Sequence, residues 1–381
     1  MKLTVHRDVF AEAVGFAARL LPQRTTLPIL GGVLISASDG SVTFSSFDYE
    51  VSARTTIVAD VQHPGTTLVS GRLLSDIAQR LPQQDVTLEL EGSTVHVRCG
   101  TAKFSLLTMP LEEYPPLPEV TGHVGTVSGS DFAESVAQTT PASSRDDVTP
   151  VITGVLLHVE GSTLHMMATD RYRVAVRTVS WSAQGSGSDD LSALIPARTL
   201  SEIGKTFAHA ETLTITIASG GDRELVAFSA DQKTVTSLLI KGSFPPVQRL
   251  FPETVENYAV VNVQELIEAT RRVSLVVERE APLRFSFSVD GVLLEALGSD
   301  QAQASESIDA HLVGEECVVS LKPQFLIDGL THTHSEFARI GFTTTDNPNK
   351  PGPVLITAQT SRDGDHSSGY RYLLQPNLLM R

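Results

Sequence analysis

The chain has 381 residues, of which 41% are hydrophobic, and its formal net charge is −15. A chain of this length exceeds one ordinary hydrophobic core, so two or three domains are expected. No apolar run approaches the roughly 20 residues that a membrane-spanning helix needs. The net acidity excludes a protein that coats nucleic acid with its whole surface, because attraction to phosphate requires lysine and arginine; it leaves room for a local basic face.

The chain contains two cysteines, Cys99 and Cys317, which lie far apart in the sequence. Two thiols are too few for a disulfide framework or a four-ligand zinc site, and they suit a reducing compartment. The first 21 residues include charged side chains such as Arg7, Glu12 and Arg19, so they lack the clean apolar core of a signal peptide. We therefore expect a cytoplasmic protein without metal or cofactor.

In chain order, the first expected element is an amphipathic helix over 8–21. Its apolar residues Phe10, Ala13, Val14, Ala17 and Leu21 recur at helical spacing and form one stripe. A strand pair that begins at Val33 follows, with an Asp-Gly turn at 39–40, where glycine tolerates a positive φ. A short second helix around 70–80 and an alternating hairpin over 87–98 complete this first set.

The same elements occur twice more in the same order. Helices are expected over 130–140 and 263–277, hairpins with Glu-Gly or Asp-Gly turns begin at 155 and 285, and later strands begin at 213 and 354. Proline-rich linkers are expected at 109–118 and 243–252, because proline at this density does not fit inside a sheet. Polar loops are expected at 181–192 and 344–352.

A fixed spacing relates the three sets. Three segments of similar pattern begin at Leu68, Leu194 and Val319, and they place Asp76, Glu202 and Asp328 at equivalent points, 126 residues apart. Three such periods account for nearly the whole chain. Self-similarity at a fixed period is the mark of a repeat architecture, so the chain is a tandem triplicate.

The residues at this point resemble a known family, the β subunit of bacterial DNA polymerase III, or DNA sliding clamp. The resemblance covers the whole chain and rests on ordered motifs. They are Met1-Lys-Leu-Thr-Val5, Arg24-Thr-Thr-Leu-Pro-Ile-Leu30, Ala168-Thr-Asp-Arg-Tyr-Arg-Val-Ala-Val176, Gly242-Ser-Phe-Pro-Pro246 and Tyr372-Leu-Leu-Gln-Pro376. The Thr-Asp-Arg-Tyr-Arg form resembles actinobacterial members.

The resemblance implies an α+β fold of three tandem clamp domains, each with two helices packed on antiparallel sheets, at 1–120, 121–254 and 255–381. It also implies a head-to-tail homodimeric ring that encircles double-stranded DNA without catalysing a reaction. Such a processivity factor tethers the DNA polymerase III alpha subunit, the clamp loader and other clamp-motif proteins. Twelve inward-facing helices about 9 to 10 Å apart would leave a hole of about 25 Å, enough for B-DNA.

Basic residues follow a pattern that fits a DNA channel. In the first helix of each set, acidic residues come early and arginines come late, which helix-dipole complementarity also explains. Through the resemblance, Arg24 and Arg72 match positions that touch DNA phosphates. Further candidates for lining the channel are Arg145, Arg198, Lys205, Arg271 and Arg272. Their contacts should be directed to phosphates and blind to sequence, because a clamp must slide.

The resemblance further implies a cleft between the second and third domains that receives a short peptide motif of each partner. Such a cleft has an apolar anchor pocket and a polar rim. The alternative for its apolar members is ordinary core. The matching positions are Ile152, Thr169, Arg171, Tyr172, Arg173, Val174, Pro245, Arg249, Leu250, Leu373, Leu374, Gln375, Pro376, Asn377, Leu378 and Leu379.

The C-terminal tail departs from the family. Members commonly end Met-Pro-(Met or Val)-Arg-Leu, whereas this chain has Gln375, Asn377 and Leu378 around a retained Pro376. Amides in an apolar pocket need hydrogen-bond partners or cost about 1 to 3 kcal/mol. One hypothesis is a specialised second clamp whose cleft excludes inhibitors of the ordinary clamp; the alternative is neutral drift in a housekeeping clamp.

Two rival classes of function are weighed. An enzyme would carry a nucleotide-binding, nucleophile-elbow or zinc-protease motif, and none occurs in the sequence. His332 and His334 could suggest a metal, and Asp170 beside Arg171 an acid with anion partners, but exposed histidines and a salt bridge explain them as well. The second rival is a repeat scaffold that binds only proteins.

Overall fold

The structure is a computed structural model that describes residues 1–22, 26–185, 190–218, 224–278, 281–296, 302–344 and 351–378. Its contacts divide into two units. Unit 1 comprises Met1–Ser130, Ser182–Ser188 and Lys205–Leu239, and unit 2 comprises Asp131–Trp181, Asp189–Gly204 and Ile240–Arg381. The division passes through the middle of the second repeat, because strands of that repeat belong to the sheets of both units.

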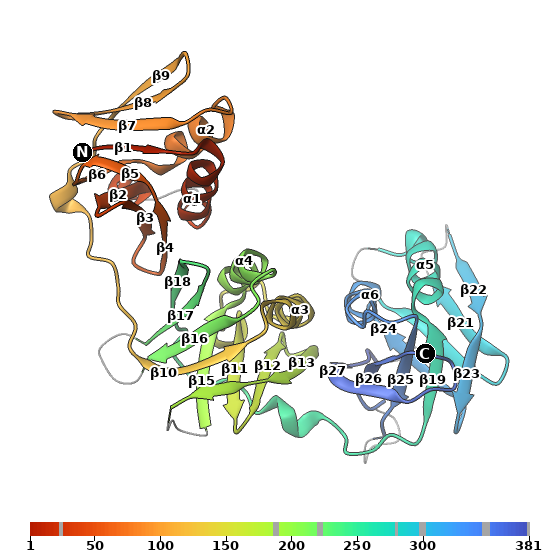
Figure 1. The fold of residues 1–381 in the computed structure, drawn as a ribbon. Helices are drawn as coiled ribbons and strands as arrows, with labels where there is room; N and C mark the ends of the chain where they lie inside the picture. The colour runs from red at the N-terminus through yellow and green to blue at the C-terminus, as the bar shows by residue number, and fades with distance from the viewer. Residues whose placement is uncertain are drawn as a thin grey trace. The chain divides into compact units, whose positions relative to one another are not determined.

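Unit 1 holds two antiparallel sheets. The first has the order β5-β1-β7-β8-β9 and the second β14-β10-β16-β17-β18-β4-β3-β2-β6 (Figure 1). The strands are β1 (Lys2–Val5), β2 (Gly32–Ser38), β3 (Ser41–Phe47), β4 (Val51–Val58), β5 (Asp60–His63), β6 (Gly65–Ser70), β7 (Val86–Glu91), β8 (Thr94–Cys99), β9 (Ala102–Leu107), β10 (Gly122–Val127), β14 (Ser182–Gln184), β16 (Leu213–Ala218), β17 (Leu225–Ala230) and β18 (Lys233–Leu238).

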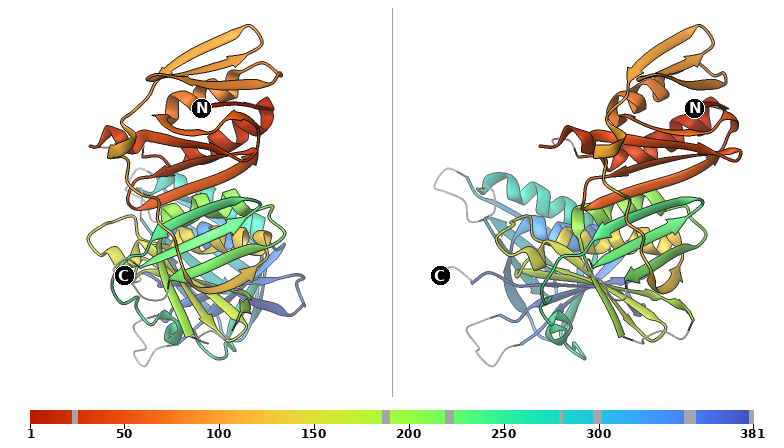
Figure 2. Two further views of the ribbon diagram at one scale, coloured as in Figure 1. Left: turned by 60° about the vertical axis from the view of Figure 1, so that its left-hand side comes forward. Right: turned by 90° about the vertical axis from the view of Figure 1, so that its left-hand side faces the viewer.

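Two helices, α1 (Arg7–Arg19) and α2 (Gly71–Arg80), pack against each other and along these strands (Figures 1 and 2). The predicted stripe of α1 is confirmed, since Phe10, Ala13, Val14 and Ala17 are all buried. Phe10 meets Phe44 of β3 edge-on at 5.8 Å between ring centroids, a favourable aromatic geometry. The helix ends at Arg19 rather than at the predicted Leu21, which lies just beyond it.

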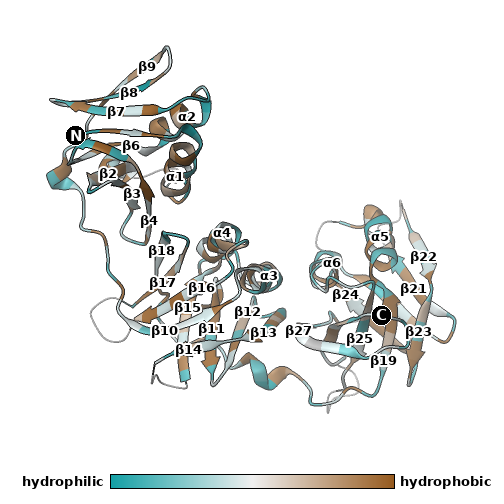
Figure 3. Ribbon diagram, viewed as in Figure 1, coloured by the Kyte–Doolittle hydropathy of each residue, from teal (hydrophilic) through white to brown (hydrophobic). Residues whose placement is uncertain are grey.

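Unit 2 also holds two antiparallel sheets, β15-β11-β12-β13-β27-β26-β25-β19-β23 and β22-β21-β20-β24. The strands are β11 (Gly154–Glu160), β12 (Thr163–Thr169), β13 (Arg173–Ser180), β15 (Asp190–Pro196), β19 (Tyr258–Asn262), β20 (Leu283–Ser288), β21 (Gly291–Ala296), β22 (Ala304–Ile308), β23 (Ala310–Val313), β24 (Cys317–Leu321), β25 (Phe337–Phe342), β26 (Val354–Gln359) and β27 (His366–Leu374). Apolar residues concentrate along the strands of both units (Figure 3).

The remaining helices are α3 (Gly129–Thr139), α4 (Ala197–Phe207), α5 (Val263–Val273) and α6 (Pro323–Thr331), of which α5 packs against α6. Asn262 caps α5 by accepting a hydrogen bond from the Glu265 backbone N–H at 3.1 Å. The predicted helix over 263–277 stops at Val273, where a 3-10 turn, Ser274–Val276, takes over. The three predicted hairpins are confirmed by the pairings β2–β3, β11–β12 and β20–β21.

One prediction for a connecting segment needs correction. The stretch 181–192 is not one loop, because strands β14 and β15 occupy its two ends. This change follows from long-range strand pairing, which local composition does not encode. The predicted linkers at 109–118 and 243–252 contain short 3-10 turns, Leu111–Glu113 and Val247–Leu250, and no named strand.

Candidate functional site

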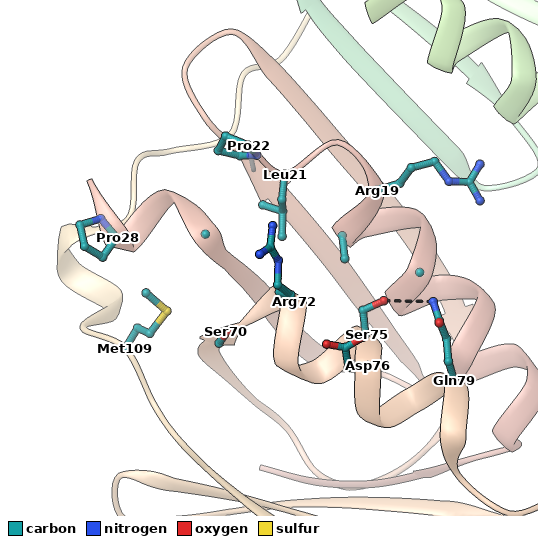
Figure 4. A pocket seen from close by; sticks show the side chains of 13 residues that line it. Arg19, Leu21, Pro22, Pro28, Ser70, Arg72, Ser75, Asp76, Gln79 and Met109 are labelled. Atoms are coloured by element: carbon teal, nitrogen blue, oxygen red, sulfur yellow. Dashed lines mark hydrogen bonds between the residues drawn. The ribbon is translucent and has the colours of Figure 1, made fainter. Parts of the chain in front are cut away.

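The first candidate surface lies on the α1–α2 pair of unit 1. A pocket of about 470 Å³ opens there, lined by Arg19 and Leu21 from the end of α1, by Arg72 and Asp76 from α2, and by neighbouring proline and small side chains. Arg72 is exposed, and Figure 4 shows its guanidinium rising from α2 toward Leu21. Asp76 instead pairs with Arg80 one turn further along, at 3.3 Å. The pocket therefore presents a cation on an open surface.

The other basic residues proposed for DNA contact differ in their surroundings. Arg24 lies outside the described residues. Arg198 and Lys205 are exposed on α4. On α5, Arg271 pairs with Glu268 at 2.8 Å, and Arg272 grips the Glu306 carboxylate of β22 through two donors, at 2.6 and 3.0 Å. That pairing raises the pKa of Arg272 and lowers the pKa of Glu306.

Arg145 lies on a loop rather than on a helix. It belongs to the exposed segment 145–148 and lines a second pocket, of about 700 Å³, that lies entirely within unit 2. We call this second pocket the cleft. Its lining residues are Ser143, Ser144, Arg145, Asp146, Val148, Thr149, Ile152, Asp170, Arg171, Tyr172, Arg173, Gln324, Phe325 and Asp328.

A tight turn between β12 and β13 carries one wall of the cleft. The Asp170 carboxylate accepts hydrogen bonds from the backbone N–H groups of Tyr172 and Arg173, at 3.0 and 3.1 Å. Arg171, between them, adopts a left-handed φ of 79°, a conformation that costs energy for a residue with a β-carbon. The turn thereby points Arg171 and Tyr172 outward, and the Arg171 guanidinium donates to the Thr149 hydroxyl across the cleft.

Arg173 anchors this turn from behind. Its side chain is only 7% exposed and donates to Asp170, to Asp328 of α6, to the Tyr372 hydroxyl of β27 and to the Pro141 carbonyl. It also lies over the Phe325 ring, 4.2 Å from the centroid. Burial raises the pKa of Tyr372, although the Arg173 charge opposes that shift. Arg173 therefore has a structural role, because the carboxylates of Asp170 and Asp328 compensate its charge.

Several predicted cleft residues form an apolar cluster elsewhere on the large sheet of unit 2. Val174 and Leu373 pack with Met167, Val176 and Val247, and the aromatic rings of Phe244 and Phe251 cover them. Val247, Arg249 and the exposed Leu250 belong to the 3-10 turn of the linker, and Pro245 precedes it. Thr169 is buried, and its hydroxyl donates to the Arg173 carbonyl. Leu374 is fully buried core.

The tail is held through its backbone. The Gln375 N–H donates to the Tyr172 carbonyl at 2.8 Å, and the Asn377 N–H donates to the Ser320 carbonyl at 2.8 Å. Pro376 between them is buried, Gln375 and Asn377 are half-buried, and Leu378 is exposed. Among the described residues, the Gln375 side-chain amide has one hydrogen-bond partner, the Pro376 carbonyl, to which it donates at 3.5 Å. Leu379 lies outside the described residues.

Within the described part of the chain, no cluster of three or more histidine, cysteine or acidic side chains could hold a metal ion. His334 meets Glu134 at 3.1 Å, and His332 contacts the Asp328 carbonyl at 2.7 Å. No described helix is long and apolar enough to cross a membrane.

Sequence reasoning missed Phe325, Gln324 and Asp328 as cleft residues. In the sequence, Asp328 stands out only as one of three equivalent positions of the repeat, with Asp76 and Glu202. Nothing in the repeat indicates that Asp328 contacts Arg173. Arg19 was likewise noticed only for its place late in a helix. These contacts join segments more than 150 residues apart, so no local pattern reveals them.

The chain consists of three repeats, each with two helices on antiparallel sheets. Its helices carry exposed cations, and a cleft lies beside the second and third repeats. These features define the DNA-clamp class of α+β proteins. The chain matches the DNA polymerase III beta subunit N-terminal domain over residues 1–118, its central domain over 126–246 and its C-terminal domain over 248–360. The chain belongs to the DNA polymerase III beta subunit family, the beta sliding clamps.

Individual relatives resemble the chain over its whole length. The beta sliding clamp of Streptomyces coelicolor is 41% identical, and the beta sliding clamp homolog GriR of Streptomyces muensis is 36% identical, each over 99% of both chains. Among solved structures, a sliding clamp from Pseudomonas aeruginosa bound to griselimycin superposes with a TM-score of 0.89 over 100% of both chains, at 24% identity.

Proposed function

We propose that this chain is a DNA sliding clamp, a non-catalytic processivity factor of the cytoplasm. Two copies close head to tail around double-stranded DNA and tether the DNA polymerase III alpha subunit, the clamp loader and other clamp-motif proteins. The domains are assigned to 1–120, 121–254 and 255–381. The observation that carries the proposal is the triplicate itself, because three domains with two helices each supply half of a ring of twelve helices.

Two unpaired sheet edges support ring closure. Strand β9 ends one sheet of unit 1 and bears the exposed Phe104 and Leu107, with Lys103 beside them. Strand β22 ends a sheet of unit 2 and bears Glu306, and Leu275 nearby is 83% exposed. Exposed apolar edge strands are aggregation liabilities unless they are paired. A second copy that pairs β9 with β22 covers both edges.

Arg72 is the best-supported phosphate contact, because it is exposed and lines an open pocket without a carboxylate partner among the described residues. Arg24, Arg198 and Lys205 remain proposed contacts. Arg271 and Arg272 are proposed as weaker ones, since each already has an acidic partner. We reassign Arg145 from the DNA channel to the cleft, where it and Arg171 supply positive charge for a partner peptide.

The decisive experiment compares retention on nicked circular DNA with retention on the same DNA made linear. After loading, a clamp stays on the circle through gel filtration and slides off free ends. Equal loss from both templates would reject encirclement, and failure to associate with either DNA while binding a polymerase peptide would favour the protein-only scaffold.

A second candidate is a specialised clamp whose cleft excludes inhibitors of an ordinary clamp. The observation that favours it is the tail, where Gln375 and Asn377 place half-buried amides beside the cleft turn. The test measures the affinity of a clamp-motif peptide and of griselimycin for the wild-type chain and for the double variant Gln375→Met/Asn377→Val. The candidate requires the double variant to bind griselimycin more tightly; equal affinities would reject it.

A further inference from the structure

A separate pocket of about 320 Å³ lies on the large sheet of unit 2 and shares no lining residue with the cleft. The segment 252–255, which we call the strap, forms one wall. Strands β25, β26 and β27 form the floor and the other walls. The lining residues are Pro252, Glu253, Thr254, Val255, Arg339, Gly341, Leu355, Thr357, His366 and Arg371.

The strap is seated directly on the sheet at Gly341. A β-carbon at this position would lie 2.8 Å from Cγ1 of Val255, closer than van der Waals contact allows. The glycine therefore lets the strap approach the sheet backbone, and the pocket is a defined concavity beneath a packed segment.

Strand register brings two arginines to the same side of the sheet. Arg339 of β25 pairs with Thr357 of β26, and Thr357 pairs with Arg371 of β27. Residues directly opposite one another in antiparallel strands share a face, so the Arg339 and Arg371 side chains leave the sheet on either side of Thr357 in one row. The three side chains all line the pocket.

Neither arginine forms an ion pair with a described carboxylate. Arg339 lies over the Tyr258 ring at 4.2 Å and donates to the Gln359 side chain at 2.9 Å and to the Gly364 carbonyl at 3.4 Å; it also contacts Nδ1 of His366 at 3.0 Å. Arg371 lies over the Phe251 ring at 4.7 Å, and its guanidinium has no hydrogen-bond acceptor among the described residues. Burial alone lowers the pKa of Arg371.

The Arg371 side chain is half-buried and is not sealed from solvent, so its guanidinium can receive an anionic ligand. The acidic groups nearby do not neutralise its charge. Glu253, the one carboxylate on the lining, is exposed on the strap and forms no ion pair with a described residue. Asp365 acts on the neighbouring His366, whose pKa is lowered by burial and by the Arg339 charge.

We propose that the strap pocket is an oxyanion-binding site, which takes a phosphate-sized anionic group between Arg339 and Arg371. The planar guanidinium fork matches oxyanions by paired, charge-assisted hydrogen bonds. The Thr357 hydroxyl supplies a further donor at the floor. None of its lining residues belongs to the DNA-contact set or lines the cleft, although Leu355 also packs against the apolar cluster that contains Val174 and Leu373.

The test is binding of inorganic phosphate to the full-length protein, followed by broadening of the ³¹P NMR signal at constant ionic strength. Arg371→Gln and Arg339→Gln should each weaken phosphate binding by at least about tenfold, the effect of losing one charge-assisted contact. Glu253→Gln should tighten binding, because it removes the one opposing charge from the lining. Arg362→Gln removes the same charge from an exposed turn outside the pocket and should leave binding unchanged.

Phosphate and acetate are titrated separately, so that the preference between a phosphoryl and a carboxylate source is read directly. Circular dichroism checks that each variant is folded; if Arg371→Gln does not fold, the opposite shifts expected for Arg339→Gln and Glu253→Gln still decide. No binding to the wild type, or equal weakening by Arg362→Gln and Arg371→Gln, would overturn the site.

Discussion

The guanidinium of Arg173 donates a hydrogen bond to the carboxylate of Asp328 at 2.5 Å, and this contact joins strand β13 to helix α6. These residues stand 155 positions apart, in the second and third repeats. The same side chain also contacts Asp170, Tyr372 and Pro141. One arginine therefore fixes both the cleft turn and the neighbouring helix.

Replacing Arg173 with Met should destabilise the protein by about 3 to 5 kcal/mol, because it leaves Asp170 and Asp328 as uncompensated, partly buried charges. Urea unfolding measures this change. Arg171→Met, two residues away on the exposed side of the same turn, serves as the control and should cost less than about 1 kcal/mol. Equal losses for the two variants would show that Arg173 is not an anchor.

Arg72→Ala should weaken association with DNA in a salt-dependent way. Losing one phosphate contact reduces the slope of log affinity against log salt by about 0.9, independent of DNA sequence. Arg80→Ala, on the same helix but paired with Asp76, is the matched control. A salt slope that falls equally in both variants would place the phosphate contact elsewhere on the helix.

Leu107→Glu should convert the dimer to a monomer, because it puts a charge on the exposed edge of β9 where the second copy is proposed to pair. Light scattering after gel filtration reports the mass. Val289→Glu alters a side chain of similar exposure, 79% against 76%, in the turn of the β20–β21 hairpin, and should leave the dimer intact. A dimeric Leu107→Glu protein would contradict the proposed interface.

His165 makes the protein sensitive to mild acid. Its pKa is lowered by burial, then by His158, and Arg371 adds to the shift. The unfolded chain therefore binds a proton that the folded chain resists, so stability falls as the pH drops through the ordinary histidine pKa of about 6.5. His165→Gln should show a smaller loss of stability between neutral and mildly acidic pH, measured by urea unfolding at each pH. An unchanged profile would exclude this residue.

The repeat, the first helices and the hairpins could be predicted because each depends on local periodicity. Phe10 and Val14, four residues apart, predict a buried face of a helix. Asp39-Gly40 predicts a hairpin turn. The helix ends were less accurate, since the stop after Val273 reflects packing rather than a helix-breaking residue.

The candidate site was harder to predict. The resemblance predicts both Arg173 and Val174 as cleft residues. In the structure, Arg173 belongs to a buried ionic network and Val174 to an apolar cluster. Adjacent residues in a strand face opposite sides, so motif membership alone does not make two residues share a surface. Arg145 was assigned to the channel by charge alone, and charge does not specify a face.

The pairings of β4 with β18 and of β13 with β27 carry a mechanical consequence. Each boundary between successive repeats is crossed by a ladder of backbone hydrogen bonds, which breaks only when several bonds yield together. A ring built from such chains would separate more easily at the seams between subunits than at the boundaries between repeats. A loader that opens the ring would then act at those seams.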